Sequence, residues 1–162
     1  MKTIYLIGFM GTGKSTVGKT LSDKLTIPFL DTDQMVVETY GPIATLFQEQ
    51  GEKTFRMYET EMLKHTPDSN HVVSTGGGIV EKKENVNFMK HHGTVIHLNA
   101  SLKEIASRLG DDPDRPLWGT NYREKVRLYN HRKALYTEAA DATILTDGKS
   151  VQEIVEEIAQ QL

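Results

Sequence analysis

The chain has 162 residues and a net charge of −3, and 25% of its residues are charged. This length fits one domain with a real core, and the lack of a basic excess argues against a nucleic-acid partner. Cysteine is absent, which excludes disulfides and restricts any structural zinc to histidine and carboxylate ligands.

The N-terminus carries one lysine, Lys2, followed by a short apolar run. That run is too short for the core of a signal peptide, and nowhere do about 18 apolar residues follow one another. We therefore expect a cytoplasmic protein with no membrane partner, organised as a single domain over residues 1–162 and acting as a monomer.

Five short β-like runs alternate with stretches of helical character, and they cover residues 3–7, 28–31, 71–75, 94–99 and 142–145. Such alternation predicts an α/β fold in three layers, with a five-stranded parallel sheet between helices on both faces. Two capping boxes predict helix starts, one at Ser101 with Glu104 and one at Ser150 with Glu153.

The first predicted strand leads into GFMGTGKST, residues 8–16, which matches the phosphate-loop pattern G-x-x-x-x-G-K-[ST]. Glycines let the backbone curl so that successive N–H groups and the next helix N-terminus face an anion. Lys14 would reach the β- and γ-phosphates and Ser15 would ligate Mg²⁺. The alternative is an ordinary strand-to-helix turn with a surface lysine. The nucleotide-binding residues predicted here are Gly11, Thr12, Gly13, Lys14, Ser15 and Thr16.

The second predicted strand ends in the sequence DTD, Asp31 to Asp33. Residues two apart on a strand share a face, so both carboxylates could point into one cleft. One could organise water around Mg²⁺ and the other could accept a proton from a substrate hydroxyl. Alternatively, Asp33 caps the following helix and Asp31 only makes a turn.

Residues 33–65 are too long for one crossover helix, because Gly41-Pro42 and Gly51 break them into three helical pieces. This helical insertion could form the pocket of a phosphoryl acceptor. Further on, Gly76 to Gly78 follow the third predicted strand. Three glycines in a row are tolerated mainly where a backbone approaches something closely, such as a substrate oxygen.

Residues 110–120 combine glycines, prolines, aspartates and Trp118, a composition typical of a mobile lid. The lid arginine, Arg115, could neutralise charge on a transferring phosphoryl group, and Arg56 and Arg132 could clamp a carboxylate. Taken singly, each arginine could also be a surface residue.

The six histidines show no metal-binding spacing, and surface or supporting roles are expected for all of them. The spacing of Tyr122, Tyr129 and Tyr136 indicates packing on a helix, so these residues are assigned no chemistry.

With these residues in view, the chain resembles the shikimate kinases from residue 4 to about residue 147. The resemblance is carried by segments that occur in order along the chain: LIGFMGTGKSTVGK, FLDTD, GEKTFRMYE, STGGGIV, DRPLW and the R-x-x-LY of residues 132–136. It implies ATP-dependent phosphorylation of the 3-hydroxyl of shikimate, in the pathway to aromatic amino acids, with Mg²⁺ as cofactor and ATP as co-substrate.

On the nucleotide side, the resemblance implies that Lys14 and Ser15 hold the ATP phosphates and Mg²⁺, and that Asp31 fixes Mg²⁺ through water. Further nucleotide contacts are implied for three residues: the lid residue Arg115, Arg108 against adenine, and Lys149 from the far side.

On the acceptor side, the resemblance implies that Asp33 binds the shikimate hydroxyls and acts as general base. Arg56 and Arg132 would clamp the shikimate carboxylate, and the backbone amides of Gly77 and Gly78 would complete the pocket.

Three departures from the family pattern are small. Ala134 stands where the family usually has proline, Trp118 where it commonly has leucine, and the connection at residues 41–43 is one residue short. Two other functions stay open: a kinase for another small hydroxy acid such as gluconate, and a nucleotide-binding switch that phosphorylates nothing. Against the switch, no guanine-reading N-K-x-D segment occurs.

Overall fold

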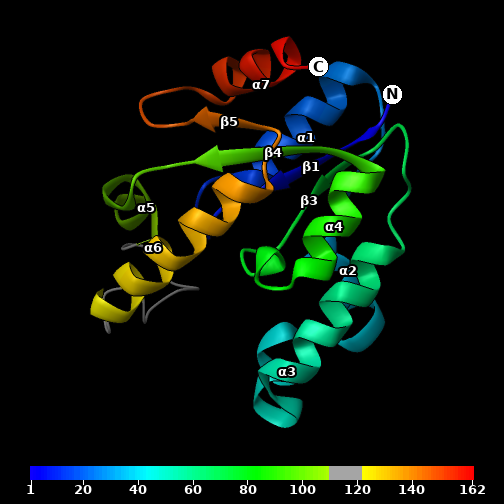
Figure 1. The fold of residues 1–162 in the computed structure, drawn as a ribbon, viewed down its shortest axis with the longest axis vertical. Helices are drawn as coiled ribbons and strands as arrows, with labels where there is room; N and C mark the ends of the chain where they lie inside the picture. Colours follow the sequence, from blue (N-terminus) through cyan, green and yellow to red (C-terminus); the bar gives the residue numbers. More distant parts are fainter. Residues whose placement is uncertain (110–121) are drawn as a thin grey trace.

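A computed structural model describes residues 1–109 and 122–162 of the chain (Figure 1). The elements follow one another as β1 (Thr3–Ile7), α1 (Lys14–Leu25), β2 (Phe29–Asp31), α2 (Thr32–Tyr40), α3 (Ile43–Lys64), β3 (Val72–Ser74), the 3-10 turn η1 (Ile79–Glu81), α4 (Lys83–His92), β4 (Gly93–Asn99), α5 (Leu102–Leu109), α6 (Tyr122–Ala139), β5 (Ala142–Leu145) and α7 (Val151–Gln160).

The strands form one parallel sheet in the order β2-β3-β1-β4-β5. All five predicted strands are present, and their ends differ from the predicted ends by one residue at most. The central strand β1 is buried along its whole length. A parallel strand covered on both faces needs apolar residues throughout, which explains why TIYLI does not alternate with polar residues.

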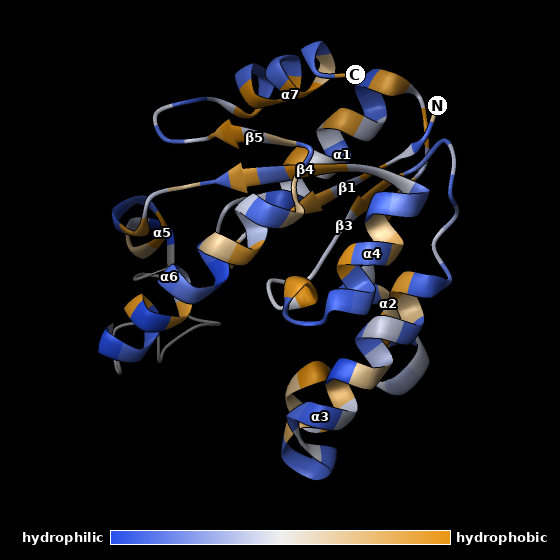
Figure 2. Ribbon diagram, viewed as in Figure 1, coloured by the Kyte–Doolittle hydropathy of each residue, from blue (hydrophilic) through white to orange (hydrophobic). Residues whose placement is uncertain are grey.

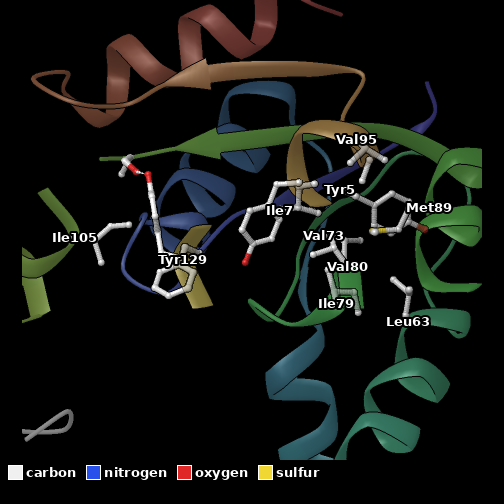
Figure 3. Packing of buried hydrophobic residues seen from close by; sticks show 14 residues of the cluster. Tyr5, Ile7, Leu63, Val73, Ile79, Val80, Met89, Val95, Ile105 and Tyr129 are labelled. Atoms are coloured by element: carbon white, nitrogen blue, oxygen red, sulfur yellow. Dashed lines mark hydrogen bonds between the residues drawn. The ribbon is translucent and has the colours of Figure 1, made fainter. Parts of the chain in front are cut away.

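Successive residues of β1 point to opposite faces of the sheet, and they divide the core in two. Ile4 and Leu6 pack with α1 and α7, while Tyr5 and Ile7 pack with α4, η1 and α6 (Figures 1 and 3). In Figure 2 the strands are largely hydrophobic, whereas the helices are hydrophobic on only some of their turns. The predicted three-layer arrangement is therefore confirmed.

Helices α2 and α3 extend away from the sheet and enclose a separate small core (Figure 1). Val36, Phe55 and Met62 are buried there, and the rings of Tyr40 and Tyr58 stack with their centroids 3.6 Å apart. Gly51 has φ 85° and ψ 166°, a conformation that only glycine adopts readily, and it kinks α3. Residues 33–65 thus form the expected three helical pieces.

One of the two predicted capping boxes is complete and the other is not. At α7, Ser150 and Glu153 make both reciprocal hydrogen bonds. At α5, Ser101 Oγ accepts from the Glu104 N–H at 3.2 Å, but the Ser101 N–H donates to Asp147 at 2.9 Å. The second half of that predicted box is therefore wrong, because a carboxylate from the loop after β5 takes the donor.

The predicted lid, residues 110–120, lies outside the described residues, together with Arg115 and Trp118. Within residues 1–109 and 122–162, no helix has both the length and the apolar character needed to cross a membrane.

Candidate active site

The phosphate loop connects the buried strand β1 to α1 at the carboxyl edge of the sheet. Gly11 and Gly13 have φ of 79° and 84°, in the left-handed region, and Gly13 precedes α1 without a side-chain cap. No side chain therefore caps the start of α1, and the N-terminus of a helix is a site at which an anion can bind. Lys14 folds over the loop, and its Nζ donates to the carbonyls of Gly8 at 2.7 Å and Phe9 at 3.0 Å.

Thr12 supports the loop from inside. Its side chain is buried, and its hydroxyl donates to the Phe9 carbonyl at 3.0 Å. Its backbone N–H donates to the same carbonyl at 3.4 Å, and Thr12 does not line the cavity in front of the loop, so this predicted nucleotide-binding residue stabilises the loop.

A cavity of about 290 Å³ opens in front of the loop. Its walls come from the loop, from the end of β2 and start of α2, and from the residues after β3. They are Met10, Gly11, Gly13, Lys14, Ser15, Thr16, Asp31, Asp33, Ser74, Thr75, Gly76 and Gly77. We call it the donor cavity.

Asp31 is the last residue of β2 and caps α2. Its Oδ1 accepts from the backbone N–H groups of Asp33 at 2.9 Å and Gln34 at 3.3 Å, and its Oδ2 accepts from Ser15 Oγ at 2.8 Å. The alternative in which Asp33 caps the helix is wrong, because Asp31 does so. Asp33 lies in the first turn of α2 rather than on the strand, yet both carboxylates still line the donor cavity.

The Ser15 hydroxyl and the Asp31 carboxylate form the oxygen pair on which a Mg²⁺ site would be built. Both line the donor cavity, and oxygen ligands are those that Mg²⁺ prefers. Among the described residues, no group of three or more histidine, aspartate or glutamate side chains could hold a metal by itself. The pair therefore fits an ion that takes its remaining ligands from phosphates and water.

A second cavity of about 180 Å³ adjoins the first, and we call it the acceptor cavity. It shares Met10, Asp33, Gly76 and Gly77 with the donor cavity. Its other walls come from α3, from the glycine loop and from α6, and they are Ile43, Phe55, Arg56, Glu59, Gly78 and Arg132. Three residues predicted from separate segments, Asp33, Arg56 and Arg132, therefore line one space.

Arg56 is held on α3 by a buried carboxylate. Its guanidinium donates to Glu59 at 3.0 Å and contacts Glu52 at 3.5 Å, and the Glu59 side chain is only 1% exposed. Burial raises the pKa of Glu59, an effect that the nearby charge of Asp33 reinforces and that of Arg56 opposes. Glu59 was not singled out from the sequence, although it lies one turn after Arg56 within GEKTFRMYE.

Arg132 reaches the acceptor cavity from α6, with a side chain that is 8% exposed. Its Nε lies 3.4 Å from Glu81, whose other carboxylate oxygen contacts His131 at 2.8 Å. Glu81, like Glu59, was missed because an acidic residue that supports an arginine carries no motif of its own.

The glycine loop separates the two guanidinium groups. A Cβ on Gly77 would lie 3.4 Å from the Arg132 guanidinium, and a Cβ on Gly78 would overlap the Arg56 guanidinium. A Cβ on Gly76 would lie 2.7 Å from carboxylate oxygens of both Asp33 and Glu59. Gly76 and Gly78 are thus explained by close approach, as expected, although here the neighbours are charged side chains of the protein; the distance at Gly77 is that of an ordinary van der Waals contact.

Two buried aromatic residues lie behind this loop. Tyr136 donates its hydroxyl proton to the Gly77 carbonyl at 2.5 Å, and its ring packs against His97 with centroids 5.0 Å apart. Burial, followed by the charges of Lys14 and Lys133, lowers the pKa of His97 to about 4, so its ring is neutral at pH 7.

The predicted packing of the three tyrosines on α6 is confirmed for two of them. Tyr129 and Tyr136 are buried, whereas Tyr122 is 54% exposed, so its predicted packing is wrong. The exposed residue stands at the first position of α6.

Of the three remaining residues predicted to contact the nucleotide, one lies near the phosphate loop, one lies away from both cavities and one lies outside the described residues. Arg108 lies against the phosphate loop, where its guanidinium donates to the Gly11 carbonyl at 3.2 Å and pairs with Glu104 at 3.3 Å. Lys149 pairs with Glu157 at 2.7 Å and lines neither cavity. Arg115 lies outside the described residues.

Comparison with known proteins gives a consistent result. The family profile described as shikimate kinase matches residues 10–162. The shikimate kinase of Bacillus cytotoxicus is 44% identical over 100% of this chain and 99% of its own length, and that of Persephonella marina is 46% identical over 98% and 97%.

Solved structures agree. A shikimate kinase from Acinetobacter baumannii in complex with shikimate superposes with a TM-score of 0.91 at 33% identity, covering 99% of this chain and 92% of that one. The shikimate kinase from Aquifex aeolicus superposes with a TM-score of 0.88 at 39% identity, covering 98% of this chain and 94% of that one. Since this agreement spans nearly the whole chain and includes the segments that form both cavities, the chain belongs to the shikimate kinase family.

Proposed function

We propose that this protein transfers the γ-phosphoryl group of ATP to the 3-hydroxyl of shikimate, giving shikimate 3-phosphate and ADP. One observation carries the proposal: a phosphate-loop cavity and a cavity with two guanidinium groups adjoin, and Asp33 lines both. A kinase needs a phosphoryl group and a hydroxyl to meet in line, and adjoining cavities provide that meeting point.

The donor cavity binds the triphosphate through backbone N–H groups and one lysine. The left-handed glycines and the uncapped start of α1 offer N–H groups to the phosphates. In the structure, Lys14 Nζ is held by two loop carbonyls, which keep the ammonium group at the mouth of the loop. There it would stabilise negative charge that builds on the transferring phosphoryl group.

Ser15 and Asp31 are the residues that would hold Mg²⁺ beside the phosphates. When bound, the ion neutralises phosphate charge and orients the phosphate oxygens. Ser15 Oγ donates to the Asp31 carboxylate at 2.8 Å, which keeps the two oxygens together.

The acceptor cavity suits a small carboxylic acid. Arg56 and Arg132 each present a planar guanidinium group, and such groups bind carboxylates through paired hydrogen bonds. The homologous protein from A. baumannii was solved in complex with shikimate, a small acid that carries a carboxylate group. The amides of Gly77 and Gly78 would add contacts from the loop between the two arginines.

Asp33 is the proposed general base. It lines both cavities, so a hydroxyl at their junction would lie within its reach. It would accept the proton of the 3-hydroxyl as the oxygen attacks the γ-phosphorus, while the bond to the β-phosphate oxygen breaks and ADP leaves.

Contacts at the edge of the nucleotide site belong to the same proposal. Arg108 lies against the phosphate loop, which supports a contact with the nucleotide. Roles for Arg115 as a catalytic lid residue and for Lys149 at the far side of the nucleotide stay predictions from the sequence. The same is true of a cytoplasmic location and a monomeric state.

An assay of ADP release tests the proposal, with ATP and Mg²⁺ combined with shikimate, with gluconate, or with no acceptor. We expect rapid ADP release when shikimate is the acceptor, and little ADP release with gluconate or without an acceptor. Lys14→Ala should lower the rate by roughly a hundredfold or more, whereas Lys19→Ala, on the exposed face of the same helix, should not. A preference for gluconate, or equal ADP release without an acceptor, would refute the proposed function.

A further inference from the structure

Tyr136 lies directly behind the acceptor cavity without lining it. It follows Arg132 by four residues on α6, so both side chains lie on the same face of the helix. Its side chain is 1% exposed, and neither cavity includes it among its walls. Any influence on a bound molecule must therefore pass through the residues that Tyr136 contacts.

The Tyr136 hydroxyl meets the cavity wall where the glycine loop lies beside Arg132. It donates its proton to the Gly77 carbonyl at 2.5 Å. A Cβ on Gly77 would lie 3.4 Å from the Arg132 guanidinium and 3.7 Å from the Tyr136 hydroxyl oxygen. The hydroxyl thus holds the loop residue that borders the guanidinium on α6.

The hydrogen bond to Gly77 also sets the direction of the next amide. The Gly77 carbonyl and the Gly78 N–H belong to the same planar peptide unit and point in opposite directions when it is trans. No cis peptide bond occurs among the described residues. Because the carbonyl points at Tyr136, behind the wall, the Gly78 N–H points away from Tyr136, and Gly78 lines the acceptor cavity.

Packing alone would not require a tyrosine here. The ring lies against neutral His97, and a phenylalanine ring would make the same contact. A buried hydroxyl has a cost unless it is hydrogen-bonded, and this one donates its hydrogen bond to the acceptor wall.

We propose that Tyr136 is a positioning residue for the acceptor, which aligns the Arg132 guanidinium and the Gly78 amide with the carboxylate of the substrate. This inference rests on the proposed function. It assigns to the hydroxyl a role in affinity for the acid acceptor, with no direct contact to the substrate and no part in ATP binding.

The test compares Tyr136→Phe with Tyr129→Phe. Tyr129 is the matched control, because it is also buried on α6 and its hydroxyl donates to a backbone carbonyl, that of Ala100 at 2.7 Å. Tyr136→Phe should raise the KM and Kd for shikimate about tenfold, the loss expected when a buried backbone carbonyl is left without its hydrogen bond. The KM for ATP should stay unchanged, and kcat at saturating shikimate should change less than the shikimate KM. Tyr129→Phe should leave the shikimate KM unchanged.

A double-mutant cycle asks whether the tyrosine acts through the clamp. In an Arg132→Gln background, the effect of Tyr136→Phe on shikimate Kd should shrink to about threefold or less, because coupled residues are not additive. A full tenfold penalty in both backgrounds, or an unchanged shikimate Kd in Tyr136→Phe itself, would overturn the inference.

Two further results keep the outcomes distinct. A wild-type protein without shikimate-dependent turnover would refute the proposed function, whereas an active wild type with an unaffected Tyr136→Phe variant would refute only this inference. If the variant does not fold, ¹³Cζ-tyrosine spectra of the wild type replace it. A buried tyrosine signal should shift with shikimate and not with ADP, and the absence of any shikimate-dependent shift would overturn the inference.

Discussion

At the scale of single residues, two carboxylates near the glycine loop have different surroundings. Asp33 lines both cavities, whereas Glu59 is 1% exposed and accepts a hydrogen bond from Arg56 through one oxygen. The other oxygen of Glu59 has no hydrogen-bond partner among the described residues. This difference supports the proposed role of Asp33 as general base and a role for Glu59 in holding Arg56.

Asp33→Asn should lower kcat by about 10²- to 10⁴-fold, the usual share of a general base, because the amide cannot accept the proton. The KM for ATP should change little. Steady-state kinetics with both substrates check this, with Glu38→Gln on the exposed face of α2 as control. A kcat equal to that of the control would remove Asp33 from the base role.

Arg56→Gln or Arg132→Gln should weaken shikimate binding by about 2 to 5 kcal/mol, as expected when one partner of a buried charge pair is removed. Calorimetric titration with shikimate measures the loss. Arg127→Gln, on an exposed position of α6, is the control for Arg132. If a variant keeps its affinity for shikimate, that arginine does not hold the carboxylate.

His97 predicts a specific pH dependence of stability. Its pKa falls from 6.5 to about 4 in the folded protein, through burial and then the charges of Lys14 and Lys133. Below pH 6.5 the unfolded chain takes up a proton that the folded chain excludes, so stability is lost as the pH falls from 6.5 towards 4. By linkage the wild type should lose about 2 kcal/mol more than His97→Gln between pH 7.5 and pH 5.

Chemical denaturation at several pH values measures this difference. The raised pKa of Glu59 gives a slope of opposite sign, but Glu59 is present in both proteins and cancels in the comparison. His91→Gln, at an exposed position, should keep the wild-type slope. Parallel curves for wild type and His97→Gln would contradict the assignment.

The residues proposed to contact a ligand directly are the ones that the sequence predicts. The spacing of Lys14 and Ser15 follows from the mechanics of phosphate binding, and paired arginines indicate a carboxylate. Glu59, Glu81 and Tyr136 act through other residues. Their types and spacings are those of ordinary helix residues, so only the three-dimensional contacts distinguish them.

At the scale of elements, one residue at the junction of β2 and α2, Asp31, both stabilises a helix and belongs to the proposed metal site. Asp31 caps α2 with one oxygen and accepts from Ser15 with the other. Asparagine can keep the cap but loses the charge, whereas alanine loses both. This junction therefore allows the two roles to be separated.

Asp31→Asn should leave the free energy of unfolding nearly unchanged and should raise the Mg²⁺ concentration needed for half-maximal turnover. Asp31→Ala should in addition cost about 1 kcal/mol of stability through loss of the cap. Thermal unfolding and Mg²⁺ titrations of the rate provide the two readouts. Equal Mg²⁺ dependence in Asp31→Asn and wild type would exclude Asp31 from the metal site.

The same junction shows the limit of reading elements from sequence. The five strands were predictable because buried parallel strands are apolar runs of β-branched and aliphatic residues. The alternation of side chains along a strand predicts that Asp33 continues the strand and shares a face with Asp31. The structure ends β2 at Asp31, since its side chain caps the next helix. At α5, Asp147 takes the Ser101 N–H, a contact 46 residues away that no local pattern indicates.

At the scale of the whole molecule, the site gathers segments that lie far apart in the chain. The strand order β2-β3-β1 brings together the carboxyl ends that carry Asp31, the glycine loop and the phosphate loop. Sequence alone predicts this meeting, because parallel strands place ligands at that edge. It could not show that α3 and α6 direct Arg56 and Arg132 into one cavity, since that depends on how helices pack beyond the sheet.

The most direct test of the account is identification of the reaction product by ³¹P and ¹H NMR after incubation with ATP, Mg²⁺ and shikimate. The account predicts one new phosphate ester, coupled to the proton at carbon 3 of shikimate, formed in equal amount to ADP. A phosphate ester at another hydroxyl, or ADP formed with free phosphate and unchanged shikimate, would contradict it.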